Sequence, residues 1–140
     1  MASTTTLLPQ APLTSELRKF TYRDLLAMEQ AGIIGADEHI ELLGGQLYKG
    51  TINPPHAMAV AFLVQRLSVA FDSRAQVIPQ NPLRLSDDLD DTELLQPDVM
   101  LVTNRLYLDH PRPSGVLLLV EVSDSTLTKD TPSSSLSMPR

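Results

Sequence analysis

The sequence contains no cysteine and few aromatic residues, and these absences narrow the chemistry open to the chain. Without cysteine it can form neither disulfides nor thiolate metal sites. Its three phenylalanines and three tyrosines are scattered, which is not the pattern of a base-stacking platform. The sequence also lacks a phosphate-cradling P-loop, a dinucleotide glycine pattern, a nucleophile elbow and paired histidines at zinc spacing. A small-molecule enzyme with a bound cofactor is therefore the least favoured class.

Long hydrophobic runs are missing as well. No apolar stretch approaches the roughly 20 residues that span a bilayer. Residues 1–9 have neither the basic region nor the apolar region of a secretory signal. We therefore expect a cytoplasmic protein that does not bind membranes. Residues 1–19 are rich in Ser, Thr and Pro, and we expect them to form a poorly ordered leader.

The 140 residues carry a net charge of −6, and 42% of them are apolar, which is the balance of one soluble globular domain. The negative charge weighs against the basic surface that nucleic-acid binding needs. Most of the excess, however, comes from one acidic run, which contains Asp87, Asp88, Asp90, Asp91 and Glu93. Such a run is typical of a solvated loop and leaves a basic patch possible elsewhere. The charge therefore weakens the case for DNA binding but does not exclude it.

Capping and turn residues predict the first elements of the chain. Thr21, followed three residues later by Asp24, is typical of a helix N-cap with a capping box, and it predicts a helix over 22–31 that ends at Gly32. A glycine pair at 44–45, between two β-prone runs, predicts a hairpin within 38–52.

The second half of the chain combines one long helix with several strands. Apolar residues recur at helical spacing from His56 to Phe71, and Pro55 suits the first turn of that helix. Few polar residues lie on this helix, so we expect it to pack on more than one side. Short strands are predicted at 75–78 and 82–85, followed by more strongly apolar strands at 98–102 and 115–122.

Each of the last two predicted strands carries one carboxylate, Asp98 at the start of the first and Glu121 near the end of the second. If the two strands pair as an antiparallel hairpin, these acids meet at one edge of the core. Buried acids are costly unless they are paired, hydrogen-bonded or metal-bound. Together they could hold a hard divalent cation such as magnesium. Alternatively, Asp98 is a turn residue after Pro97, and Glu121 forms a structural ion pair.

Two further residues have both a functional and a structural interpretation. His56, at the start of the long helix, could be a base, a metal ligand or a donor that orients a substrate, although a lone histidine there is more often a local cap. Glu41 lies in an apolar strand. It needs a partner if it faces inward, whereas it needs none on the solvent face, and the alternation of the strand does not decide between the two.

Five short motifs occur together in order: ELLGGQL at 41–47, PPH at 54–56, NPLRL at 81–85, QPDV at 96–99 and VEVSDST at 120–126. With them the chain resembles, over roughly residues 20–130, the Uma-two family of bacterial restriction-endonuclease-like proteins. That family belongs to the PD-(D/E)XK nuclease superfamily. The resemblance implies an α/β (α+β) fold in which a mixed central sheet is flanked by helices.

The resemblance also implies roles for particular residues. Asp98 and Glu121 would be the metal-binding carboxylates, with Mg²⁺ (or Mn²⁺) as the ion, and Glu41 and His56 would be auxiliary catalytic residues. The expected reaction is hydrolysis of a DNA phosphodiester bond by a metal-activated water. DNA is the expected partner, and a homodimer is compatible with this interpretation.

The chain departs from the family pattern after the second acid. The usual superfamily lysine, two residues later, is Ser123 here, and a lysine is then expected from the following helix, where only Lys129 is available. Residues 131–140 instead form a Ser- and Pro-rich tail without an apolar period, which we expect to be disordered. We therefore expect a nuclease-like domain over 20–130 that lacks the C-terminal elements of the family through truncation or frameshift. The alternative to an impaired nuclease is a non-catalytic binding or regulatory module that keeps the fold.

Overall fold

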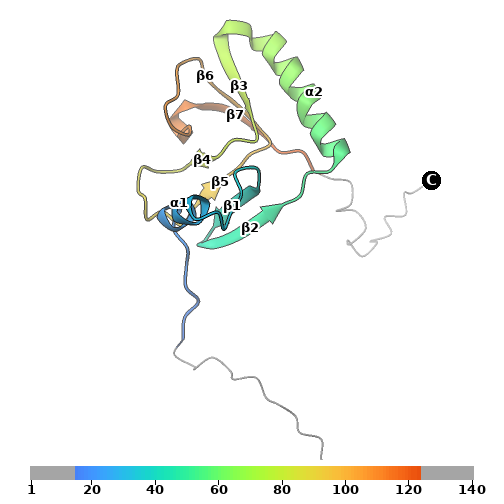
Figure 1. Ribbon diagram of the computed structural model, residues 1–140. Helices are drawn as coiled ribbons and strands as arrows, with labels where there is room; N and C mark the ends of the chain where they lie inside the picture. Colours follow the sequence, from blue (N-terminus) through green and yellow to red (C-terminus); the bar gives the residue numbers. More distant parts are fainter. Residues whose placement is uncertain (1–14, 124–140) are drawn as a thin grey trace, which may run out of the picture.

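The computed structural model describes residues 15–123, and the expectations for residues 1–14 and for 124–140, including Lys129, lie outside this part (Figure 1). The fold is α+β, as predicted. Its strands form two antiparallel sheets, one with the order β2-β1-β5-β4 and one with the order β3-β6-β7. The helices are α1 (Tyr22–Gln30) and α2 (Pro54–Phe71), with short 3₁₀ turns η1 (Asp72–Arg74) and η2 (Pro113–Gly115); the strands are β1 (His39–Leu43), β2 (Gln46–Gly50), β3 (Ala75–Pro79), β4 (Leu83–Arg84), β5 (Leu94–Leu95), β6 (Val99–Thr103) and β7 (Val116–Val120).

Helix α1 begins with the predicted capping box. The backbone N–H of Asp24 donates to the Thr21 hydroxyl at 3.2 Å, and the Asp24 carboxylate accepts from the Thr21 N–H at 3.0 Å. The backbone hydrogen bond from Thr21 is the main cause that lowers the pKa of Asp24. The helix ends at Gln30, one residue earlier than expected, and Gly32 follows with a positive φ of 73°.

Replacing Thr21 by alanine should lower the free energy of unfolding by about 1 kcal/mol, because the first turn of α1 loses its side-chain acceptor. Chemical denaturation monitored by circular dichroism measures the change. Thr51→Ala is the control, since Thr51 is exposed and lies outside helices and strands. Equal stability of the two variants would contradict a capping role.

The glycine pair at 44–45 forms the predicted hairpin turn between β1 and β2. Gly44 and Gly45 have φ values of 58° and 78°, which residues other than glycine rarely adopt. A Cβ atom on Gly45 would also lie 2.5 Å from the Cβ of Lys19. The hairpin register pairs Leu42 with Leu47 and Glu41 with Tyr48.

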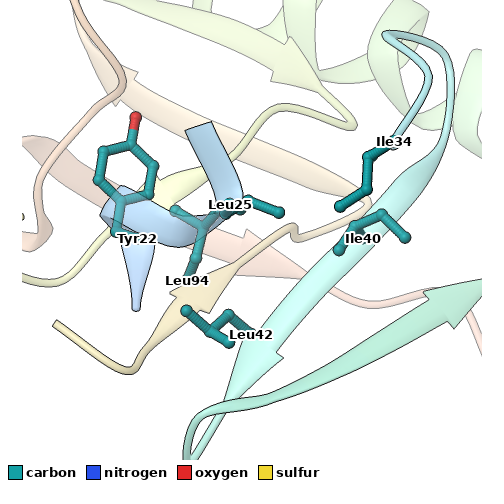
Figure 2. Packing of buried hydrophobic residues seen from close by; sticks show 6 residues of the cluster. All are labelled: Tyr22, Leu25, Ile34, Ile40, Leu42 and Leu94. Atoms are coloured by element: carbon teal, nitrogen blue, oxygen red, sulfur yellow. The ribbon is translucent and has the colours of Figure 1, made fainter. Parts of the chain in front are cut away.

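One hydrophobic cluster joins α1 to the first sheet. Figure 2 shows Leu25 of α1 close to Leu94 of β5, with Leu42 of β1 beneath them and Ile34 beside Ile40. Since Ile40 and Leu42 are buried, Glu41 between them points to the opposite face of the sheet. The alternation of β1 therefore orients Glu41 away from this cluster.

Helix α2 packs on β3 and β6 with one side only, so the expectation of packing on several sides is wrong for the described part of the chain. Val60 is its only buried residue, whereas Met58, Phe62 and Val69 are 71%, 55% and 78% exposed. Apolar residues occur all round this helix and predicted burial on several sides, but residues 15–123 pack against one side of it only.

The predicted antiparallel hairpin of the last two strands is confirmed. β6 pairs with β7 with Val99 opposite Val120, and a bulge interrupts the register near Val102. Residues of β6 contribute to a second cluster, in which Met100 and Val102 contact Leu83 of β4.

The two-residue strand β5 was not predicted. The described strands also form two antiparallel sheets in place of a single mixed sheet. No helix of residues 15–123 is long and apolar enough to cross a membrane.

Candidate metal-binding site

The pairing of β6 with β7 brings Asp98 and Glu121 together at one end of the hairpin. Each acid directly adjoins one member of the Val99–Val120 pair. Asp98 is only 5% exposed, and its Oδ2 accepts a hydrogen bond of 2.7 Å from the backbone N–H of Val122. The backbone after Glu121 is thus bonded directly to Asp98, which places the two acids as the antiparallel arrangement predicted.

His56 reaches the same carboxylate from the first turn of α2. Asn53 caps this helix by accepting the backbone N–H of His56 at 3.0 Å. The ring Nε2 of His56 lies 2.9 Å from Oδ1 of Asp98, and the side chains of His56 and Asp98 are 15% and 7% exposed. An ionised carboxylate only accepts hydrogen bonds, so with Asp98 ionised this contact requires the tautomer or charge state of His56 that carries a proton on Nε2. Both oxygens of Asp98 are thus engaged, one by the His56 ring and one by the Val122 N–H.

Glu41 lies on the sheet face of β1 that is turned away from the core cluster. Its Oε1 accepts a hydrogen bond of 2.9 Å from the backbone N–H of Gln96, two residues before Asp98. The open question of its orientation is thereby answered, since the half-buried side chain has a partner. Gln96 itself was missed as a contributor to this site, although its place directly before Pro97-Asp98 was visible in the sequence.

The electrostatics of Glu121 show that these groups lie close together. Partial desolvation, then the charge of Asp98 and a hydrogen bond with it, and then the charge of Glu41 raise the pKa of Glu121 from 4.5 to about 7. His56 acts in the opposite direction. Although Glu121 is exposed by surface area, like charges nearby still disfavour its ionised form. Four side chains predicted for the site thus interact at the β6–β7 end.

Titration of Glu121 by carboxyl NMR should give a pKa near 7, and Asp98→Asn should lower it, because the nearest negative charge is removed. The raised pKa also makes the free energy of unfolding depend on pH. The folded state has its full stability with respect to Glu121 below about pH 4.5, where the residue is protonated in both states, and this stability is lost as the pH rises through about 7. Asp90→Asn, at an exposed carboxylate that pairs with Arg23, is the matched control. A Glu121 pKa near 4.5 in the unsubstituted protein would contradict this arrangement.

The donor set fits a hard divalent cation in its chemistry. Mg²⁺ uses one or two protein carboxylates and completes its shell with water and substrate phosphate. After desolvation, the negative charges of Asp98 and Glu41 raise the pKa of Glu121, and a bound cation would relieve this repulsion. Within residues 15–123, no group of three or more His, Asp or Glu side chains is arranged to hold a metal ion by itself. The two carboxylates therefore suit an ion that keeps several waters, and they do not form a closed structural site.

The position of the usual superfamily lysine is occupied by Ser123, which is exposed. A family model described as "Uma2: Putative restriction endonuclease" matches residues 22–133, a span that contains Glu41, His56, Asp98 and Glu121. Neither the curated proteins nor the solved structures gave a match.

Proposed function

Because the chain belongs to the Uma2 family of restriction-endonuclease-like proteins, as its motifs predicted, we propose that it is a metal-dependent endonuclease that hydrolyses phosphodiester bonds in DNA. Membership in this family, and through it in the PD-(D/E)XK superfamily, indicates a nuclease-like function, DNA as the substrate class and a general dependence on a divalent metal ion. Mg²⁺ or Mn²⁺ as the ion, action in the cytoplasm and the roles of single residues are part of the proposal.

The observation that carries the proposal is the meeting of Asp98 and Glu121 beside His56 and Glu41. Asp98 and Glu121 are the residues that would hold the ion. When bound, a divalent ion lowers the pKa of water and neutralises the charge that develops on the phosphate.

The remaining residues of the site orient these carboxylates. The Val122 N–H and the His56 ring each hold one oxygen of Asp98, which fixes the plane of the carboxylate. Glu121 is protonated below about pH 7 and must lose its proton to act as a ligand. Metal binding should therefore release a proton from its carboxyl group near neutral pH.

The acidic run at 87–93 is less of an obstacle to DNA than its charge suggests. Asp90 pairs with Arg23 at 3.0 Å, and Asp87 pairs with Arg112 at 2.8 Å. The carbonyl oxygens of Leu89 and Asp91 accept backbone N–H groups from the first turn of α1. The run therefore serves partly as a structural connection to α1, with some of its charge neutralised locally.

A non-catalytic module that binds DNA is the second candidate, and Ser123 at the position of the usual lysine favours it. The test is cleavage of supercoiled plasmid DNA by the purified 140-residue protein with Mg²⁺ or Mn²⁺, compared with excess EDTA. Metal-dependent nicking that is lost in Asp98→Ala and Glu121→Ala supports the nuclease. Equal cleavage by all three proteins indicates a contaminating enzyme, and DNA binding without cleavage supports the second candidate.

A further inference from the structure

Gln96 lies where the chain passes from one sheet to the other. It follows β5 of the first sheet and precedes β6 of the second, with Pro97 and Asp98 between (Figure 1). Glu41 belongs to the first sheet, whereas Asp98 and Glu121 adjoin strands of the second. The relative placement of the two sheets therefore determines how far Glu41 stands from the two acids.

Gln96 is hydrogen-bonded to both sides of this junction. Its backbone N–H donates to Oε1 of Glu41 at 2.9 Å, and its side-chain Oε1 accepts from the N–H of Ile40 at 3.2 Å. Its Nε2 donates to the carbonyl oxygen of Gln80 at 2.9 Å. One half-buried residue thus bonds to two neighbouring residues of β1 and to the segment after β3.

The network continues from Gln80 to the candidate metal site. The backbone N–H of Gln80 donates to the carbonyl oxygen of Asp98 at 2.9 Å. Gln80 has a φ of 48°, which is uncommon for a residue other than glycine. Such a conformation persists where surrounding contacts impose it, and the hydrogen bonds to Gln96 and Asp98 are two such contacts.

Packing alone does not hold the sheets at this point. A cavity of about 380 Å³ opens at the junction, and its lining includes Ile40, Gln80, Leu94 and Gln96. Close packing resists displacement, whereas atoms beside a cavity lack neighbours on one side. The hydrogen bonds of Gln96 therefore act beside the packing of Leu83 and Leu95 on Met100, which also joins the two sheets.

We propose that Gln96 is a positioning residue. Its side-chain amide group holds β1, and with it Glu41, at a fixed position relative to Asp98 and Glu121 of the second sheet. This inference rests on the proposed function. The contacts require one acceptor for the Ile40 N–H and one donor for the Gln80 carbonyl. A primary amide supplies both, whereas an ionised carboxylate supplies no donor and methionine supplies neither in useful strength.

The first test measures geometry without metal. Residual dipolar couplings of the 140-residue protein report the orientation of β1–β2 relative to β6–β7 in Gln96→Met and in Gln65→Met, a matched control at an exposed glutamine of α2. We expect one common alignment tensor for both sheets in the unsubstituted protein and in Gln65→Met, and diverging tensors in Gln96→Met. One common tensor in Gln96→Met would overturn the proposal.

The second test connects geometry to the site through Mn²⁺ affinity, measured by calorimetry. Gln96→Met should weaken Mn²⁺ binding about 10-fold, as loss of a residue that supports metal ligands commonly does. Combining it with Glu41→Gln should give less than the sum of the two separate effects, because the residues act together. Additive effects, or unchanged affinity despite diverging tensors, would overturn the link to the site. Absence of Mn²⁺ binding in the unsubstituted protein contradicts the proposed function instead, and the dipolar couplings then still decide the role of Gln96 at the junction.

Discussion

Replacing Asp98 by asparagine should reduce Mg²⁺-dependent DNA cleavage by at least about 100-fold, the upper end of the loss seen when a residue that merely supports a metal ligand is removed. The amide of the Asp98→Asn variant would keep one oxygen for the Val122 N–H but would lack the negative charge that a cation needs. Because the side chain changes little in size, the packing around position 98 is preserved, while the amide nitrogen faces the His56 ring in place of Oδ1. Plasmid nicking rates and circular dichroism spectra together measure the effect on activity and confirm the fold.

Asp90→Asn is the control for this experiment, since it removes the same charge from an exposed carboxylate that pairs with Arg23. We expect it to cleave like the unsubstituted protein. A folded Asp98→Asn variant that retains full activity would exclude Asp98 as a metal ligand. The nuclease proposal would then lose its central residue.

Replacing Leu42 by alanine should lower the free energy of unfolding by about 2–5 kcal/mol, a large fraction of the roughly 5–15 kcal/mol that stabilises a domain. Leu42 has 0% exposure and lies in the cluster with Leu25 and Leu94 that joins α1 to the first sheet. Its truncation removes apolar contacts and leaves a cavity between the helix and β1. Chemical denaturation of both proteins gives the difference.

Leu106→Ala is the matched control, because the same change is made at a side chain that is 84% exposed. Its effect should stay within about 0.5 kcal/mol. Similar destabilisation by the two substitutions would contradict the position of Leu42 in the core. Since Leu42 adjoins Glu41, its substitution should also loosen the placement of that carboxylate.

Local sequence signals predicted the elements that depend on neighbouring residues. The capping box at Thr21 and the glycine pair at 44–45 each act within a few residues, so their structures followed directly from the sequence. The meeting of Asp98 with Glu121 was also predictable, because antiparallel pairing of two adjacent apolar strands joins their opposite ends.

Long-range contacts could not be predicted in the same way. The two-residue strand β5 is too short to show a period, yet it pairs with both β1 and β4. The bond from Gln96 to Glu41 spans 55 positions, and no spacing rule connects such residues. Apolar periodicity likewise shows that α2 can be buried but not how much of it will be.

The exposed strand β7 also affects how the newly synthesised protein behaves in a cell. Leu117, Leu118 and Leu119 are 58%, 43% and 43% exposed, and among residues 15–123 only β6 pairs with this strand. Neither a charged residue nor a proline interrupts Val116–Val120, and an edge strand without such protection is a template for another extended polypeptide. Chaperones that shield such segments, and proteases that recognise them, would therefore compete with self-association for this strand. The lifetime of the polypeptide after synthesis should depend on what occupies that edge first.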